Sequence, residues 1–211
     1  MKVVIVYDNT SASEDLVADW GFSALIEAHG RRILFDTGAN GSILLQNMEK
    51  LGIDPQSIEE ILISHDHWDH TGGLAEILKI KPVKVYIPKS ASEPMGASEV
   101  VRVDKAIKLH EGIYSTGELK KIEQSLVVAI DDGVAVIVGC SHSGIKNIIK
   151  AAEKFGHVRA LIGGYHGFDE FDYLKRIDLV VPTHCTQFKS EIKKLYPAAY
   201  LEGGVGRIFE L

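Results

Sequence analysis

Three histidines and two aspartates lie within six consecutive positions of this 211-residue chain, directly after an apolar run. The stretch ILISHDHWDHT spans residues 61–71 and holds His65, His67, Asp69 and His70. Imidazole nitrogens together with a carboxylate are typical ligands of zinc and other borderline divalent ions, whereas Mg²⁺ and Ca²⁺ prefer oxygen ligands. The stretch therefore predicts a transition-metal site.

The spacing of these residues indicates more than one metal position. His65 and His67 are two residues apart on an extended segment, so both side chains can leave the same face. Asp69 and His70 follow where the chain turns toward two glycines, and we expect them to point toward a neighbouring volume. One short loop can therefore serve two adjacent metal positions.

The elements that would position these side chains can be read from runs rich in Val and Ile, bounded by Gly, Asp or Pro. Such runs predict strands at 2–7, 22–28, 31–36, 59–64, 83–88, 125–130, 134–139, 158–164, 177–182 and 207–211. Helices are predicted between them, at 42–52, 72–79, 144–156, 169–177 and 186–196. Residues 89–124 carry only short β signals, at 106–110 and 112–119.

Three later strands are also followed by a histidine, namely His142, His166 and His184. A residue at a strand end is anchored on a rigid element, and the loop lets its ring reach inward. One such histidine is usually an ordinary surface or core residue, but several together favour a metal site. Cys185 lies beside His184 and could be a soft ligand, although burial as a small apolar side chain is its expected role. Cys140 is likewise expected to be buried.

Two segments share one pattern, residues 33–70 and residues 134–170. Each is predicted to contain a strand, a glycine-containing turn, a helix, a second strand and a turn rich in His or Asp. Strand–helix–strand units form parallel pairs with functional loops at the carboxyl ends of the strands. The doubled unit predicts two sheets face to face, helices outside, and the polar turns at one edge.

Composition limits the classes of function. A chain of this length with 45% hydrophobic residues can bury one substantial core, and we expect a single domain over residues 1–211. The net charge of -6 leaves no basic excess for phosphate backbones, so nucleic acid is not an expected partner. The sequence lacks a signal-peptide pattern and an apolar run of about 20 residues, so we expect no membrane association and a cytoplasmic location. The composition is compatible with either a monomer or a homo-oligomer.

Taken together, these motifs resemble the signature of the metallo-β-lactamase superfamily over nearly the whole chain. The HxHxDH pattern of residues 65–70 carries the resemblance, with LFDTG around Asp36, GCSH ending at His142 and PTHC around His184. The resemblance implies an α/β fold, a four-layer αββα sandwich. It also implies one or two metal ions at the sheet edge, usually Zn²⁺, with Mn²⁺, Fe²⁺ and Ni²⁺ as alternatives.

The same resemblance assigns roles to individual residues. It implies ligands His65, His67 and His142 for a first metal, and Asp69, His70 and His184 for a second. Asp36 is then expected to hydrogen-bond the loop of residues 65–70, called the ligand loop below, without touching metal. Asp69 is expected to orient the nucleophile as well.

One position departs from the family pattern. The superfamily usually has a metal-bridging aspartate after a late strand, but here that strand is followed by Tyr165 and His166, with no carboxylate until Asp169. An imidazole nitrogen cannot bridge two ions as a carboxylate can, so the second ion is expected to bind more weakly. We expect His166 to be a second-metal ligand or an acid/base toward substrate.

The predicted chemistry follows from these ligands. A divalent ion with an open position lowers the pKa of bound water to roughly 7 and polarises a carbonyl or phosphoryl oxygen. The sequence thus predicts a metal-dependent hydrolase of a small, anionic metabolite. The motifs GCSHSGI, IGGYH and PTHC also resemble a subgroup with the archaeal dihydropterin–ribosylaminobenzene-phosphate synthases. That implies the alternative of a transferase joining a pterin diphosphate to an aminobenzene ribonucleotide. A non-catalytic, metal-dependent ligand binder is a third alternative.

Overall fold

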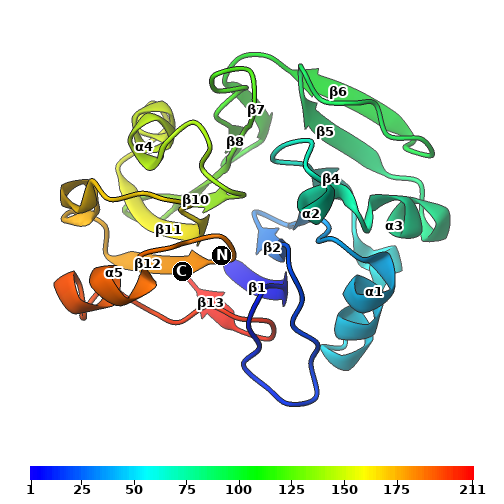
Figure 1. Cartoon of the computed structure of the whole chain (residues 1–211). Coiled ribbons are helices and arrows are strands. Elements are labelled where there is room, and N and C mark those ends of the chain that lie inside the picture. Colours follow the sequence, from blue (N-terminus) through cyan, green and yellow to red (C-terminus); the bar gives the residue numbers. More distant parts are fainter.

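The computed structural model describes residues 1–211 and contains two β-sheets with helices on their outer faces (Figure 1). The first sheet has the order β13 (Ile208–Glu210), β1 (Lys2–Tyr7), β2 (Ser23–Ala28), β3 (Arg31–Phe35), β4 (Glu60–Leu62), β5 (Lys84–Pro88) and β6 (Glu99–Val103). The second has the order β12 (Leu179–Thr183), β11 (Val158–Gly164), β10 (Gly133–Val138), β9 (Leu126–Ile130), β8 (Ile113–Ser115) and β7 (Ile107–His110).

The helices are short and connect or follow the strands. They are α1 (Gly41–Lys50), α2 (Trp68–Thr71), α3 (Leu74–Ile80), α4 (Ile145–Ala152) and α5 (Lys189–Leu195), with 3₁₀ helices η1 (Pro55–Ser57) and η2 (Phe171–Leu174). No helix combines the length and apolar character that crossing a membrane requires.

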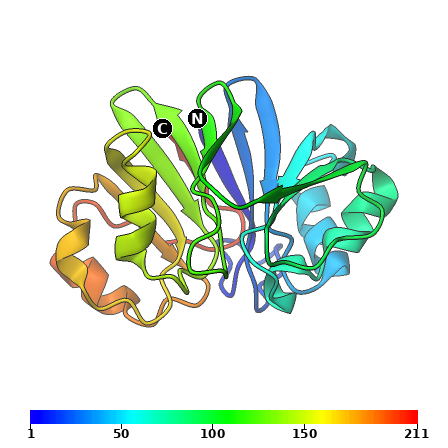
Figure 2. The same cartoon turned by 90° about the horizontal axis from the view of Figure 1, so that it is seen from above.

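Three apolar clusters fill the space between the layers. One lies between the two sheets and includes Phe35 of β3 and Ile137 of β10. A second packs the first sheet against α1 and α3, through Leu44 and Ile77. The third packs the second sheet against α4 and α5, and includes Ile148. The resulting order of helix, sheet, sheet and helix, seen from above in Figure 2, confirms the predicted αββα sandwich.

Both predicted strand–helix–strand units are present. Strands β3 and β4 pair in parallel on either side of α1 in the sequence, and β10 and β11 do so around α4. Helix α4 buries Ile145, Ile148, Ile149 and Ala152, a spacing that places all four on one face. Strand β12 is parallel to β11. The carboxyl ends of these strands therefore meet at one edge of the sandwich, where the polar turns lie.

The structure differs from the sequence prediction at two helices and at strand β6, which was not predicted. The helix predicted at 169–177 is only the short η2, because the backbone N–H groups of this segment bond three residues back, as from Tyr173 to Glu170 and from Lys175 to Asp172, and not four. Helix α2, at residues 68–71, was not predicted and precedes the predicted α3. Gly73 separates the two, and a Cβ there would lie 2.5 Å from the carbonyl oxygen of Thr37. This close approach docks the ligand loop against the turn after β3.

Candidate metal centre

Five polar residues follow the strands whose carboxyl ends meet at this edge. Asp36 follows β3, His65 follows β4, His142 follows β10, His166 follows β11 and His184 follows β12. Asp36, His166 and His184 have φ between 42° and 55°. Residues with side chains rarely adopt this left-handed conformation, and it persists where the surrounding structure fixes it, often at functional sites.

His65, His67 and His142, the first histidine group, surround one volume. Their ring centroids are 4.5 Å (His65–His67), 4.8 Å (His67–His142) and 4.9 Å (His65–His142) apart. The Nε2 atoms of His65 and His142 are buried and have no hydrogen-bond partner. Buried polar atoms are rarely left unpaired, and neutral imidazole nitrogens facing one volume are suited to a transition-metal ion. The first group therefore fits such an ion.

Asp69, His70 and His184, the second ligand group, lie beside the first. The Oδ2 atom of Asp69 is 3.2 Å from His184 Nε2 and 3.9 Å from His70 Nε2. The ring of His70 is 4.2 Å from that of His65, so the two groups are contiguous. Two imidazoles and a carboxylate within this distance also fit a divalent ion.

Asp36 is fully buried and accepts three hydrogen bonds that fix the ligand loop. The Ser64 N–H donates to Oδ1 at 2.6 Å, while the Ser64 hydroxyl and His70 Nδ1 each donate to Oδ2 at 2.7 Å. Because the Ser64 hydroxyl gives its proton to Asp36, it accepts one from His65 Nδ1, 2.8 Å away. This network places the proton of both rings on Nδ1 and leaves both Nε2 atoms unprotonated, the form that binds a cation. His65 Nε2 has no partner, whereas His70 Nε2 lies 3.1 Å from Cys140 Sγ.

The loop between β1 and β2 supplies further contacts, which the sequence analysis missed. Asp8 accepts a hydrogen bond from the His184 N–H at 2.7 Å, and Asn9 Oδ1 lies 2.9 Å from His184 Nδ1. Trp20 Nε1 donates to Asp69 Oδ2 at 2.9 Å. The one sequence signal was the polar Asp8-Asn9 pair directly after a predicted strand, and nothing local linked it to a residue 175 positions away.

Burial favours the neutral form of three of these imidazoles, those of His65, His70 and His142. It lowers the pKa of His65 and His70 far below the ordinary value, and that of His142 to about 4. Burial alone would raise the pKa of the Asp69 carboxyl, but the hydrogen bond with His184 and the nearby His70 ring outweigh it and lower that pKa. Neutral imidazoles and an ionised carboxylate are the forms that bind metal.

A cavity of about 420 Å³ opens onto both groups, and Trp20, Trp68, His67, Asp69, His166 and His184 contribute to its wall. His166 is exposed, and its ring lies 5.1 Å from that of His142. The structure thus places His166 at the mouth of the cavity, beside the first histidine group. The Trp68 side chain is 65% exposed and stands at the rim.

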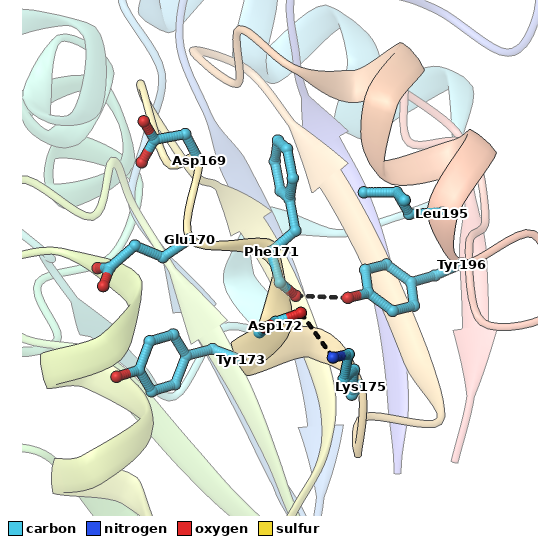
Figure 3. A pocket seen from close by; sticks show the side chains of 8 residues that line it. All are labelled: Asp169, Glu170, Phe171, Asp172, Tyr173, Lys175, Leu195 and Tyr196. Carbon is cyan, nitrogen blue, oxygen red and sulfur yellow. Dashed lines mark hydrogen bonds and ion pairs between the residues drawn. The ribbon is translucent and has the colours of Figure 1, made fainter.

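A larger hollow, of about 800 Å³, lies over η2 and α5 (Figure 3). Its polar groups are largely satisfied, because the Tyr196 hydroxyl donates to the Phe171 carbonyl at 2.7 Å and Lys175 pairs with Asp172 at 2.7 Å. It contains no histidine or cysteine. Size alone therefore does not make it the functional site.

Comparisons with known proteins agree with this geometry. Residues 21–155 match the sequence profile of the metallo-beta-lactamase superfamily. An uncharacterized protein of Methanocaldococcus jannaschii is 30% identical over 98% of both chains. The 7,8-dihydropterin-6-methyl-4-(beta-D-ribofuranosyl)-aminobenzene-5'-phosphate synthase of the same organism is 28% identical over 81% of this chain and 82% of its own. The crystal structure of a metal-dependent hydrolase of the beta-lactamase superfamily superposes with a TM-score of 0.79 and 27% identity, covering 100% of this chain and 99% of that one. This chain therefore belongs to the metallo-β-lactamase superfamily.

Proposed function

We propose that this protein is a metal-dependent hydrolase of a small, anionic metabolite. The observation that carries the proposal is the pair of buried Nε2 atoms of His65 and His142, which have no hydrogen-bond partner. His142 lines the same cavity as His67, Asp69 and His184. The first histidine group would hold one ion and the second ligand group another. Zn²⁺ suits these ligands best, with Mn²⁺, Fe²⁺ and Ni²⁺ as alternatives.

The residues at the cavity divide the remaining work. A bound divalent ion would activate water near neutral pH and polarise a carbonyl or phosphoryl oxygen of the substrate. Asp69, whose Oδ2 is fixed by Trp20 at 2.9 Å, orients the attacking water. His166, exposed at the cavity mouth, is placed to hydrogen-bond the substrate and to give a proton to its leaving group.

The preference for an anion rests on the start of helix α4. Gly144 and Ile145 border a hollow of about 350 Å³ that shares His142 and His166 with the main cavity. The first N–H groups of a helix have no intrahelical partner and carry partial positive charge, so they favour negatively charged groups. Asp169 and Glu170 line the same hollow, so a phosphate or carboxylate of the substrate would have to contact the N–H groups at the helix start while its reacting group reaches the metal centre.

An assay with the purified protein tests this function. Phosphoester and carboxylic-ester substrates would be offered to the native protein, to protein stripped by a chelator, and to stripped protein resupplied with Zn²⁺. The His65→Ala variant should be inactive, whereas His110→Ala, whose Nε2 contacts Glu60 outside the centre, is the matched control. Hydrolysis that survives metal removal, or that His65→Ala leaves unchanged, would contradict the proposal.

A second candidate function is a transferase that joins a pterin diphosphate to an aminobenzene ribonucleotide. It is supported by the 28% identity to the M. jannaschii synthase over most of both chains. The same metal centre would then bind the diphosphate that leaves. Diphosphate release that requires both substrates would favour this function over hydrolysis.

A further inference from the structure

We propose that Cys140 binds as a thiolate shared by both metal ions, in place of the carboxylate that usually bridges them in this superfamily. The inference rests on the proposed metal-dependent function, since the ions themselves are proposed there. It assigns a metal-binding role to a residue for which the sequence predicted only burial as a small apolar side chain.

The position of the sulfur carries the proposal. Cys140 Sγ belongs to two sets of potential ligands, one with His65 and His142 and one with His70 and His184. Within each set all ligand atoms lie within 4.8 Å of one another, and Sγ is 3.1 Å from His70 Nε2. Ligand atoms of a tetrahedral zinc ion lie roughly 3.3–3.6 Å apart, given Zn–N of about 2.0–2.1 Å and Zn–S of about 2.3 Å. One sulfur is therefore within reach of both positions.

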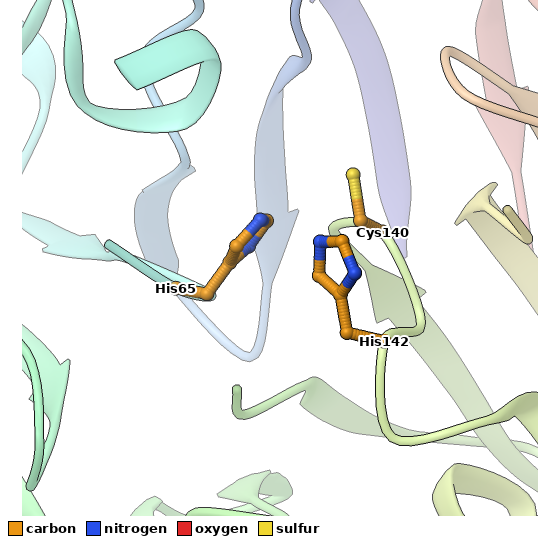
Figure 4. Close-up of side chains that lie close together, drawn as sticks. All are labelled: His65, Cys140 and His142. Atoms are coloured by element: carbon orange, nitrogen blue, oxygen red, sulfur yellow. The ribbon is translucent and has the colours of Figure 1, made fainter. Parts of the chain in front are cut away.

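The surroundings hold this sulfur in place. Cys140 follows β10, is 3% exposed, and lies close to His65 and His142 (Figure 4). The preceding carbonyl, of Gly139, accepts a hydrogen bond from the Gly164 N–H at 3.0 Å, which ties the turn to β11. The backbone that carries this side chain is therefore held at the sheet edge.

The chemistry of a thiolate suits the gap in the ligand set. Metal coordination deprotonates a thiol outright, and soft thiolate ligands favour zinc. Ions in two-metal sites lie about 3.5–4 Å apart, a separation that one sulfur at about 2.3 Å from each can span. Its negative charge would offset the repulsion between the ions, as the missing aspartate would. The sequence predicted weak binding of the second ion because His166 stands where the bridging aspartate usually lies. With a bridging Cys140 thiolate, the second ion should bind more tightly than that.

Cys185 offers a matched control. Its Sγ lies 3.3 Å from that of Cys140, but Cys185 belongs to neither set of potential ligands. Its thiol can donate a hydrogen bond to the Cys140 sulfur. Because the chain has only two cysteines, Cys185→Ser leaves Cys140 as the single thiol.

X-ray absorption spectroscopy at the zinc edge decides the question. Metal-free parent protein and the Cys185→Ser and Cys140→Ser variants would be loaded with Zn²⁺, and bound zinc would be counted by elemental analysis. We expect two zinc ions per chain and about one sulfur neighbour per zinc, at about 2.3 Å, in the parent and in Cys185→Ser. Cys140→Ser should lose the sulfur signal and bind the second ion at least about tenfold more weakly.

The outcomes separate the inference from the proposed function. Zinc surrounded only by nitrogen and oxygen would overturn the role of Cys140 while leaving a metal centre in place. If two zinc ions bind but the average is about half a sulfur neighbour per zinc, the sulfur contacts only one ion, and the bridging arrangement is overturned. Loss of the sulfur signal in Cys185→Ser would overturn it as well. A parent protein that binds no zinc would overturn both proposals. If Cys140→Ser does not fold, the single-thiol Cys185→Ser variant still decides.

Discussion

Replacing Asp36 with asparagine tests how the ligand loop is held. Asp36 accepts hydrogen bonds at Oδ1 from the Ser64 N–H and at Oδ2 from the Ser64 hydroxyl and His70 Nδ1. Asparagine keeps one acceptor oxygen and replaces the other with an NH₂ group. If that NH₂ faces His70, the ring must move its proton from Nδ1 to Nε2, the atom that would bind metal. If it faces the Ser64 N–H, two donors meet in a buried space.

A backbone N–H cannot become an acceptor, so the arrangement in which the NH₂ group faces His70 is favoured. It weakens the second ligand group more than the first histidine group, because His70 belongs to the second. Loss of a carboxylate that orients a metal-binding histidine typically costs 10–100-fold in metal affinity, which is about 1.4–2.7 kcal/mol. We therefore expect the second zinc ion to bind Asp36→Asn about 10–100-fold more weakly. The first ion should change less, because His65 is held through Ser64 and not by Asp36 directly.

Calorimetric titration of the metal-free proteins with Zn²⁺ measures both affinities. Glu60→Gln is the control, since Glu60 is another buried carboxylate that contacts a histidine, His110, but lies at the amino end of β4. Its zinc affinities should equal those of the parent. Parent-like binding of both ions by Asp36→Asn would refute the role given to this residue.

Three further predictions concern the frame and the cavity. Asn47 is fully buried, donates to the carbonyls of Val6 and Val17, and accepts from the Val17 N–H. Asn47→Ala should therefore lower the free energy of unfolding by about 2–3 kcal/mol in denaturant titrations. A change below about 0.5 kcal/mol would contradict this. His166→Ala should lower kcat at least about 100-fold without changing zinc content, and lost zinc would instead make His166 a ligand. In metal-free protein the folded-state pKa of His142, about 4, lies below its ordinary value of 6.5. The unfolded chain therefore takes up protons first, and stability should fall as pH decreases from 7 toward 4; equal denaturation midpoints at pH 7 and 5 would contradict this.

The sequence predicted the features that local patterns encode. Runs of Val and Ile marked strands such as β1 and β11 within a residue or two, because buried strands need apolar side chains over most of their length. The doubled strand–helix–strand pattern placed His65 and His142 at the same edge, since parallel strands end together. Strand β6 (EVVRV) has three valines but also the charged Glu99 and Arg102, buries only one residue of five, and was not predicted.

Contacts between distant segments were beyond the reach of sequence patterns. Asp8 and Asn9 meet His184 only because β1 lies in one sheet and β12 in the other, with their ends at a common edge. The position of Cys140 likewise depends on how the turn after β10 packs against the loop of His70. The sequence shows only that Cys140 lies near His142. It cannot show whether the thiol is buried away from the metal ligands or faces them.

Anomalous diffraction from zinc-loaded crystals tests the central claim most directly. Difference maps calculated from data on either side of the zinc absorption edge would locate each ion without assumptions about its ligands. We predict two peaks, one within about 2.0–2.3 Å of ligand atoms in the first histidine group and one within the same distance of the second ligand group. In fully loaded crystals, the absence of a peak at both groups would contradict the account.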